Sequence, residues 1–440
     1  MATTSDVTGV EDVLRGQAPH VLVALLRRYG GSGGLGDCED AVQEALHAAA
    51  TTWTVRGVPE RPRGWLIRVA SRRLVDARRR DHARARREQE VAARQPADAR
   101  WAPSAEEERG DPDEPAVAKD DTLTLLFLCC HPALTTPSQV ALTLRAVAGL
   151  TTAQIAAAFL VPPATMAQRI SRAKATLHAA GARFERPAAA DVEARLVAVR
   201  HVLYLVFNEG YTASSGADLV DVSLTEEATR LTRELRKMRP DDRETAGLLA
   251  LMLLTDARRR ARTDERGDLV PLREQDRARW DRTTIAEGVR LLEDVLPRGE
   301  VGPYQLQAAI AAVHAEATAW NDTDWPQILV LYRMLARLAP GPAVTLNLAV
   351  AAGMAEGPHA GLAVVEPLLA DPAMGDHHRT HAVRAHLLEM AGRLDEARDE
   401  YTAAARRTTS LPEQRYLNAR RARLGATGGG STPAPASGAS

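Results

Sequence analysis

Side chains that could perform chemistry occur between residues 208 and 281 of this 440-residue sequence, but their spacing does not form a recognised site. Carboxylates, an amide and a phenol gather in polar stretches, at Asn208, Glu209, Tyr211, Asp256, Asp276 and Asp281. Such residues could hold a metal ion or assist hydrolysis, yet neither metal-ligand spacing nor a nucleophile triad joins them. Cys38, Cys129 and Cys130 lack zinc spacing too, and the apolar run around the vicinal pair predicts buried, unreactive thiols. We therefore expect no catalysis, no metal site and no cofactor.

The arginines have a clearer chemical meaning, because guanidinium groups suit phosphates. Between Arg61 and Arg87 there are eleven arginines and two aspartates. A helical pattern in this segment predicts an inner face of Trp65, Val69 and Leu74, with arginines pointing outward. Such a dense basic face predicts salt-dependent binding to nucleic acid. Trp65 has two interpretations, a core anchor or a platform on which an unpaired base stacks.

A second basic element lies in the stretch TTAQIAAAFLVPPATMAQRISRAKATL, residues 151–177. It predicts two short helices separated by two prolines, the first capped by Thr152 and packed through Ile155 and Phe159. The inner face of the second helix should carry Met166, Ile170, Ala173 and Leu177. Its opposite face would present Thr165, Gln168, Arg169, Arg172 and Lys174, as a helix-turn-helix presents side chains to DNA. Taken alone, the pattern also fits a helical hairpin with a solvated basic face.

A polar-faced helix is predicted upstream, in the stretch DCEDAVQEALHAAATTW. Its inner face would carry Val42, Ala45, Leu46 and Ala49. Its outer face would carry Asp40, Gln43, Glu44 and His47. An acidic and amide face next to a basic helix indicates either a protein-binding surface or an ordinary solvated face.

The elements that position these side chains are expected to be helices throughout. Alanine, leucine and arginine dominate and aromatic residues make up only 4% of the chain, which favours an all-α fold. The net charge of -1 conceals local asymmetry, because residues 88–121 hold eleven acidic residues against four basic ones and predict a flexible acidic linker. The start of the sequence is not typical of a signal peptide, and we find no apolar stretch of about 20 residues, so we expect a cytoplasmic protein without membrane contact.

The C-terminal half contains hints of helical repeats. The stretch HLLEMAGRLDEARDEYTAAARR places Gly392 at a turn and small or aromatic residues at the positions of a tetratricopeptide (TPR) hairpin, and Gly357 occupies a similar turn about 35 residues earlier. A generic helical bundle is the alternative. The last residues, ATGGGSTPAPASGAS, are of low complexity and are predicted to be disordered.

In their order along the chain, these elements resemble the sigma-70 superfamily of bacterial RNA polymerase initiation factors, of the compact extracytoplasmic-function (ECF) type. The resemblance covers roughly residues 10–182 and implies core RNA polymerase and promoter DNA as partners. The stretch DCEDAVQEAL resembles the helix that binds the coiled coil of the largest polymerase subunit. This implies core-binding roles for Asp37, Asp40, Gln43 and Glu44.

Two further stretches resemble the promoter-reading helices of these factors. WLIRVASRRLVDARRR is similar to the helix that opens and reads the minus-10 element, which implies DNA-binding roles for Trp65, Arg68, Arg72, Arg73, Asp76, Arg79 and Arg80. LTTAQIAAAFLVPPATMAQRISRAKATL is similar to the minus-35 reader, usually of the form VPxGTVxSRLxRA, which implies such roles for Thr152, Thr165, Gln168, Arg169, Arg172 and Lys174. Ala164, Ala167 and Gln168 replace a glycine, a common lysine and a common serine of that pattern. The minus-35 preference of typical members therefore does not carry over.

The C-terminal half resembles a subgroup with a long TPR-like helical extension. We therefore predict sigma region 2 at 10–87, the acidic linker at 88–118, the helix-turn-helix of sigma region 4 at 119–182, a first helical C-terminal part at 186–298, TPR-like hairpins at 299–425 and a disordered tail at 426–440. The expected function is promoter-specific initiation, regulated by the C-terminal domain through an intramolecular or protein partner. The alternatives are a TPR-containing helix-turn-helix regulator without polymerase partnership, and an enzyme with an appended DNA-binding module, which no constellation of residues supports.

Overall fold

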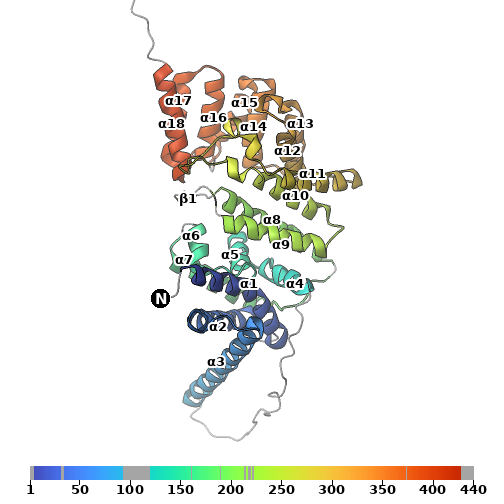
Figure 1. Cartoon of the computed structure of the whole chain (residues 1–440), viewed down its shortest axis with the longest axis vertical. Helices are drawn as coiled ribbons and strands as arrows, with labels where there is room; N and C mark the ends of the chain where they lie inside the picture. Colours follow the sequence, from blue (N-terminus) through green and yellow to red (C-terminus); the bar gives the residue numbers. More distant parts are fainter. Residues whose placement is uncertain are drawn as a thin grey trace, which may run out of the picture. The chain divides into compact units, whose positions relative to one another are not determined.

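The structure is a computed structural model, and it confirms an all-α fold (Figure 1). It describes residues 4–30, 34–92, 119–159, 161–188, 190–212, 215–216, 220, 222–372 and 374–427. The chain divides into two compact units, of which the first comprises Met1–Ala157 and Val161–Val202 and the second comprises Ala158–Leu160 and Leu203–Ser440. The division falls within one helix rather than in the break predicted between residues 182 and 186.

Three long helices open the first unit. They are α1 (Thr4–Tyr29), α2 (Gly34–Arg56) and α3 (Pro62–Ala92), and each packs against the other two. Their shared core includes Leu22, Leu25, Ala45, Leu66 and Leu74, all almost fully buried. Figure 1 shows the C-terminal part of α3 extending beyond α1 and α2.

The rest of the first unit is made of shorter helices. They are α4 (Lys119–Cys129), α5 (Thr136–Ala146), α6 (Thr152–Ala158), α7 (Pro163–Ala179) and the first part of α8 (Val192–Tyr211). Pro162 caps α7 and Pro163 opens it, as the sequence predicts. The predicted inner face of α7, Met166, Ile170, Ala173 and Leu177, is buried.

The second unit continues with helices to residue 427. Its α-helices are the remainder of α8, α9 (Val222–Met238), α10 (Arg243–Asp256), α11 (Arg282–Val295), α12 (Pro303–Glu316), α13 (Trp325–Leu338), α14 (Pro342–Glu356), α15 (Pro358–Val365), α16 (His378–Met390), α17 (Leu394–Arg407) and α18 (Leu411–Thr427). Short 3-10 turns join several of them, at Arg259–Ala261, Leu272–Glu274, Arg277–Arg279, Leu296–Arg298, Trp320–Asp322 and Glu366–Ala370. Two-residue strands, β1 (Ser215–Gly216) and β2 (Thr409–Ser410), pair in parallel.

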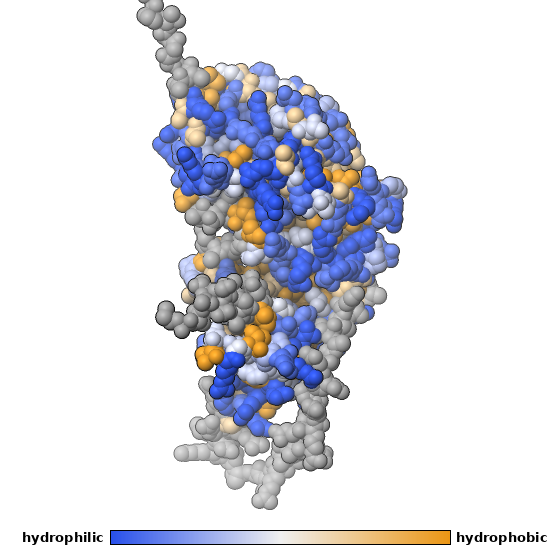
Figure 2. Space-filling model, viewed as in Figure 1, coloured by the Kyte–Doolittle hydropathy of each residue, from blue (hydrophilic) through white to orange (hydrophobic). Residues whose placement is uncertain are grey.

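The helices from α12 onward pack as successive neighbours, as Figure 1 shows. The two predicted turn glycines join such neighbours: Gly357 has φ +100° between α14 and α15, and Gly392 has φ +76° between α16 and α17. Only glycine adopts this left-handed conformation without strain, which explains its presence at both turns. Ala397, Tyr401 and Ala404 of the predicted hairpin are buried. The view in Figure 2 shows mainly hydrophilic residues on the outer surface of these helices, with small hydrophobic patches.

One predicted boundary and one predicted helix face differ from the structure. Helix α3 continues to Ala92, so the predicted linker does not begin at residue 88; residues 93–118 lie outside the described residues, as do 428–440 of the predicted tail. The inner face of α3 is built from Leu66, Ala70 and Leu74, whereas Trp65 and Val69 are only half-buried. The predicted inner face of α3 is therefore displaced by about one residue from the buried face.

Candidate nucleic-acid interface

The arginines of α3 form one exposed face. Arg68, Arg72, Asp76 and Arg79 follow one another at i, i+4, i+8 and i+11, and all four are exposed, as are Arg73 and Arg80 beside them. This spacing places one side chain on each successive turn, opposite the buried face of Leu66, Ala70 and Leu74. A phosphate backbone lying along α3 would therefore meet a guanidinium group on nearly every turn.

Trp65 lies at the start of this face and packs against a second indole. Its ring centroid is 5.5 Å from that of Trp53, with the two planes at 61° in an edge-to-face arrangement. Trp53 is buried and acts as the core anchor, while Trp65 remains half-buried. Nearby, the loop between α2 and α3 exposes Val58, and Val55 in the last turn of α2 is also exposed. Trp65 thus packs against a core tryptophan and keeps part of its side chain accessible.

The polar face of α2 is also where the sequence predicts it. Asp37, Asp40, Glu44 and His47 are exposed and Gln43 is half-buried, whereas Val42, Ala45 and Ala49 are buried. Glu44 Oε2 lies 3.7 Å from Arg73 Nε of α3, so the acidic face and the arginine face adjoin. Because both side chains of this pair are more than half exposed, the pair adds little stability and leaves both faces accessible.

The outer face of α7 carries four of the predicted DNA contacts. Thr165, Gln168 and Arg172 are exposed and Arg169 is half-buried, at the spacing i, i+3, i+7 and i+4 that defines one helix face. The preceding helix α6 is capped by Thr151 rather than by Thr152. The Thr151 hydroxyl accepts a hydrogen bond from Gln154 N at 3.2 Å, and the Gln154 side chain accepts one from Thr151 N at 2.8 Å. This reciprocal capping box leaves Thr152 as the first helical residue, half-buried.

Lys174 does not lie on this outer face. It follows Ile170 by four residues and precedes Leu177 by three, which places it at the edge of the buried face of α7. Its ammonium group donates to Glu39 Oε2, and to Asp40 Oδ1 at 2.6 Å, both on α2. Only 15% of its side chain is exposed. Burial disfavours the charged form, but Glu39 and Asp40 outweigh burial and raise the pKa of Lys174 above its usual value.

Glu39 is the centre of this contact, which we call the Glu39 clasp and define as Glu39, Asp40, Arg145 and Lys174. Glu39 Oε1 accepts a hydrogen bond from Arg145 Nε of α5 at 2.7 Å, while its other oxygen accepts from Lys174. Its side chain is 3% exposed, so it is a buried carboxylate held between two cations. The clasp therefore connects the predicted polymerase-binding helix to the predicted minus-35 reader. Elsewhere in this unit, an ion pair joins α1 to α4, with Arg27 Nη2 2.6 Å from Asp121 Oδ1.

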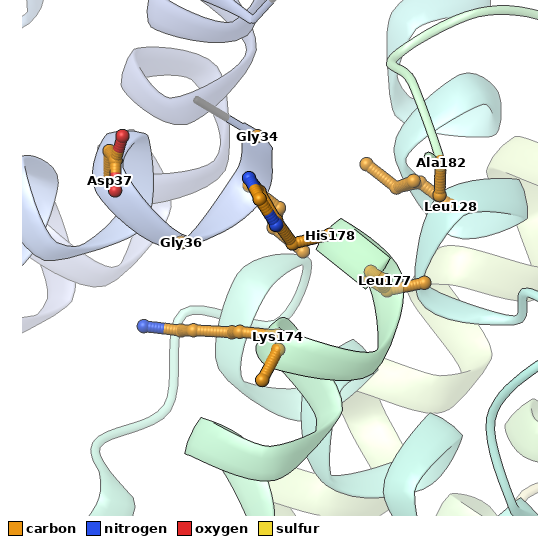
Figure 3. A pocket seen from close by; sticks show the side chains of 10 residues that line it. Gly34, Gly36, Asp37, Leu128, Lys174, Leu177, His178 and Ala182 are labelled. Atoms are coloured by element: carbon orange, nitrogen blue, oxygen red, sulfur yellow. The ribbon is translucent and has the colours of Figure 1, made fainter. Parts of the chain in front are cut away.

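The contact between α2 and α7 is incomplete. A cavity of about 180 Å³ lies beside the clasp, between the first turn of α2 and the last turns of α7, and Lys174 and His178 line it (Figure 3). Figure 3 shows both side chains extending from α7 toward the turn that contains Gly34 and Gly36. A polar contact with an adjoining cavity is typical of interfaces that separate, in contrast to a densely packed apolar core.

Sequence reasoning missed Glu39 and Arg145. A signal for Glu39 was present, because Leu35, Glu39 and Val42 share one buried face at i, i+4 and i+7. A carboxylate on an apolar helix face requires a partner elsewhere in the fold, since an unpaired buried charge is costly. The identity of that partner could not be deduced from the sequence, because Arg145 and Lys174 lie more than one hundred residues away.

Three of the residues with catalytic potential, Asp256, Asp276 and Asp281, have structural contacts. Asp276 and Asp281 accept hydrogen bonds from backbone N–H groups at the starts of helical segments, and Asp256 pairs with Arg259 at 2.7 Å. Among the described residues, no group of three or more His, Cys, Asp or Glu side chains could hold a metal ion. All three cysteines are free and buried, and burial raises the pKa of Cys38 to about 11 and that of Cys130 to about 12. No helix in the described ranges is long and apolar enough to cross a membrane.

Known protein families match three consecutive parts of this chain. Residues 19–84 match sigma-70 region 2, residues 124–177 match sigma-70 region 4, and residues 195–296 match a family of unknown function (DUF6596). An uncharacterized protein of Rhizobium meliloti (strain 1021) is 42% identical over 414 residues, which cover 94% of this chain and 95% of the relative. No solved structure matches the chain.

Proposed function

Because the chain belongs to the sigma-70 family, with regions 2 and 4 in the ECF-like arrangement followed by a C-terminal extension, we propose that it binds core RNA polymerase and directs initiation at specific promoters. The observation that carries this proposal is the exposed arginine face of α3 directly beside the exposed acidic face of α2. The arginine face of α3 suits DNA, and the acidic face of α2 suits a basic protein surface. The protein acts by binding and performs no chemistry of its own.

Each predicted partner has a separate surface. Asp37, Asp40, Gln43 and Glu44 are the proposed contacts with the coiled coil of the largest polymerase subunit. The arginine face of α3 binds minus-10 DNA, and an unpaired base is captured near Trp65 and the loop that exposes Val58. Thr165, Gln168, Arg169 and Arg172 on α7 bind minus-35 DNA, and the acidic segment between the two regions follows the positively lined RNA channel of the polymerase.

Lys174 is the proposed contact whose present environment conflicts with DNA binding. Its ammonium group is bonded to Glu39 and Asp40, so a phosphate would have to replace two carboxylates. Asp40 is itself a proposed polymerase contact. We therefore propose that the Glu39 clasp opens when polymerase binds α2, which releases Lys174 for DNA.

Run-off transcription tests the function directly. Purified full-length protein is added to core RNA polymerase on a template that carries the promoter region adjoining its own gene. We expect a discrete transcript that depends on both the protein and the core enzyme. A protein that binds this DNA yet neither associates with core polymerase nor supports a transcript would instead be the alternative, a helix-turn-helix regulator with a helical scaffold.

Arg172 provides a test of the minus-35 contact. We expect Arg172→Ala to weaken promoter binding and to reduce the slope of log K against log salt concentration by about one, because one phosphate contact is lost. Fluorescence anisotropy of labelled promoter DNA over a salt series measures both quantities. His178→Ala, in the last turn of the same helix, is the control and should leave the salt slope unchanged. An unchanged slope in Arg172→Ala would remove Arg172 from the set of phosphate contacts.

The C-terminal unit is proposed to regulate initiation, and the structure suggests where to truncate the chain. A fragment ending at Arg183 would remove Leu196, Val199 and Val202, which are buried and belong to the first unit. It would also remove Arg195, whose Nη1 donates a hydrogen bond to Phe127 O at 3.1 Å. A fragment ending at Val202 keeps these contacts.

We expect the fragment ending at Val202 to retain its helical circular-dichroism signal and to differ from the full-length protein in transcription by about fivefold or more, the usual range of an allosteric coupling. Reporter assays in cells and run-off transcription measure the difference. Equal output from fragment and full-length protein in both settings contradicts the regulatory role.

A further inference from the structure

Three segments of the C-terminal unit have no part in the proposed function and contact one another. They are the end of α8, the segment between α10 and α11, and the end of α12. Arg262, after α10, donates through Nη1 to Tyr211 O and through Nη2 to Thr212 Oγ1 at 2.9 Å, at the end of α8. Arg277, before α11, donates through Nη1 to His314 O and Ala317 O, both at 2.6 Å, at the end of α12. The segment between α10 and α11 is thus anchored on both sides by buried arginines.

A third arginine, Arg258, lies two residues after the end of α10 and faces the same tryptophan ring as Arg277. Its guanidinium carbon is 5.9 Å from the ring centroid of Trp280, and that of Arg277 is 4.7 Å from the same centroid, so both cations face one indole. Within the part of the chain that the structure describes, no carboxylate or carbonyl accepts a hydrogen bond from the Arg258 guanidinium, although the residue is half-buried. Half-buried arginines normally have such a partner, because desolvated charge is costly.

The neighbouring carboxylates bond to other side chains and not directly to this cluster. Asp256 is bonded to Arg259 at 2.7 Å, Asp322 accepts from Thr318 Oγ1 at 2.6 Å, and Glu413 accepts from Thr408 Oγ1 at 2.9 Å. Arg262 and Arg277 are satisfied by neutral carbonyl and hydroxyl oxygens, which supply no negative charge. Within the described residues, none of these three guanidinium groups forms an ion pair with a carboxylate, although the negative charges of Asp256, Asp322 and Glu413 act on Arg262 or Arg277 from a greater distance.

The positive charge of the cluster shifts the pKa values of the surrounding groups. Burial, together with the charges of Arg258 and Arg277, lowers the pKa of His314 to about 3, so this histidine is neutral at physiological pH. Burial and the charge of Arg258 likewise lower the pKa values of Arg262 and Arg277 below the usual arginine value. The local field therefore disfavours every further positive charge and favours an anion.

Two buried polar atoms next to the cluster also lack partners. Trp280 is 3% exposed and its Nε1–H, which can only donate, has no acceptor. The Nδ1 atom of His314 is buried and has no partner either, and it can donate in one neutral tautomer. Unused donors in a buried site indicate an absent acceptor, since buried polar groups are almost always hydrogen-bonded.

A contrasting set of arginines lies in α9 and directly after α10. A cavity of about 470 Å³ is lined in part by Arg230, Arg233 and Arg259. Each of these is already paired, Arg230 with Glu227, Arg233 with Glu287 and Arg259 with Asp256. The three arginines of that cavity are thus paired, whereas Arg258 has no ion-pair partner among the described residues.

We propose that Arg258, with Trp280 and His314, forms a binding site for a small tetrahedral oxyanion of the phosphate class, either free phosphate or the phosphate group of a small metabolite. The Arg258 guanidinium supplies a forked set of donors that suits phosphate oxygens, and the buried Arg262 and Arg277 supply the surrounding positive field. The site is independent of the proposed initiation function, because all its residues lie in the second unit.

Calorimetric titration of the full-length protein with inorganic phosphate tests this site, with the ionic strength held constant by sodium chloride. We expect saturable binding, and we expect Arg258→Gln to weaken it by roughly tenfold or more, as loss of a charge-assisted hydrogen bond implies. Arg260→Gln is the matched control, because it removes one exposed positive charge from the same segment. Parallel titrations with glycerol 3-phosphate and with sodium acetate distinguish a phosphate ester and a carboxylate from free phosphate.

Thermal unfolding separates a binding role of Arg258 from a structural one. Without phosphate, Arg258→Gln should unfold at the same or a higher temperature than wild type, because it relieves repulsion from Arg262 and Arg277. Phosphate should then raise the Tm of wild type and of Arg260→Gln but not that of Arg258→Gln. The proposal is overturned if phosphate does not bind saturably, if both variants lose phosphate affinity equally, or if the protein prefers acetate. It is also overturned if Arg258→Gln without phosphate has a Tm well below that of wild type.

Discussion

Replacing Asp40 and Glu44 together by lysine is expected to reduce the affinity for core RNA polymerase by about a hundredfold or more, and to abolish run-off transcription. Both carboxylates are exposed on one face of α2, where they would meet a basic partner surface. Charge reversal replaces attraction by repulsion, which costs several kcal/mol at an interface, and about 2.7 kcal/mol already corresponds to a hundredfold change. Association measured by biolayer interferometry with immobilised core enzyme gives the change in Kd.

The controls separate polymerase contact from two other effects. Replacing Glu185 and Asp191 by lysine produces the same change in net charge at exposed positions between α7 and α8, and should leave binding close to wild type. Asp40 also accepts from Lys174, so its replacement disturbs the Glu39 clasp, whereas Glu44 is not part of it. Glu44→Lys alone should therefore weaken polymerase binding while α7 stays in place. Undiminished core binding by the double variant would favour the helix-turn-helix regulator without polymerase partnership.

Glu39→Gln is expected to open the Glu39 clasp without changing the fold of either region. The substitution keeps the shape of the side chain but leaves Arg145 and Lys174, 12% and 15% exposed, without their shared counter-ion. Breaking a buried ion pair by removal of one partner costs about 3–5 kcal/mol, and here that cost is avoided if α7 separates from α2. We expect faster amide hydrogen exchange in α7 and about tenfold tighter binding of minus-35 DNA, since a larger fraction of molecules is competent to bind.

Two variants identify the cause of that effect. Glu44→Gln removes an exposed carboxylate from the same helix outside the clasp and should change neither amide exchange in α7 nor DNA affinity. Lys174→Met also breaks the clasp but removes the released ammonium group, so it should speed up exchange without the full gain in DNA affinity. If Glu39→Gln leaves both exchange and DNA binding at wild-type values, the clasp does not restrain region 4 and Lys174 has another role.

Much of the interface followed from periodicity alone. The buried faces of α2 and α7 were predicted from apolar residues at i, i+3 and i+4 spacing, because such a stripe can be buried only on one side of a helix. The exposed arginines of α3 were expected for the same reason. The inner face of α3 differs from the predicted one because the core accommodates Trp53, and Trp65 is only half-buried.

The sequence by itself determined the all-α fold, the order of the two sigma regions and the faces that meet solvent, because these depend on residues a few positions apart. Only the tertiary structure decided that Lys174 is held by Glu39 and Asp40, and that Arg258 lies beside Trp280 with no ion-pair partner among the described residues. Whether a buried charge is paired depends on which distant segment packs against it. Helical periodicity locates the charge on a face, but it contains no information about the partner that the fold brings to that face.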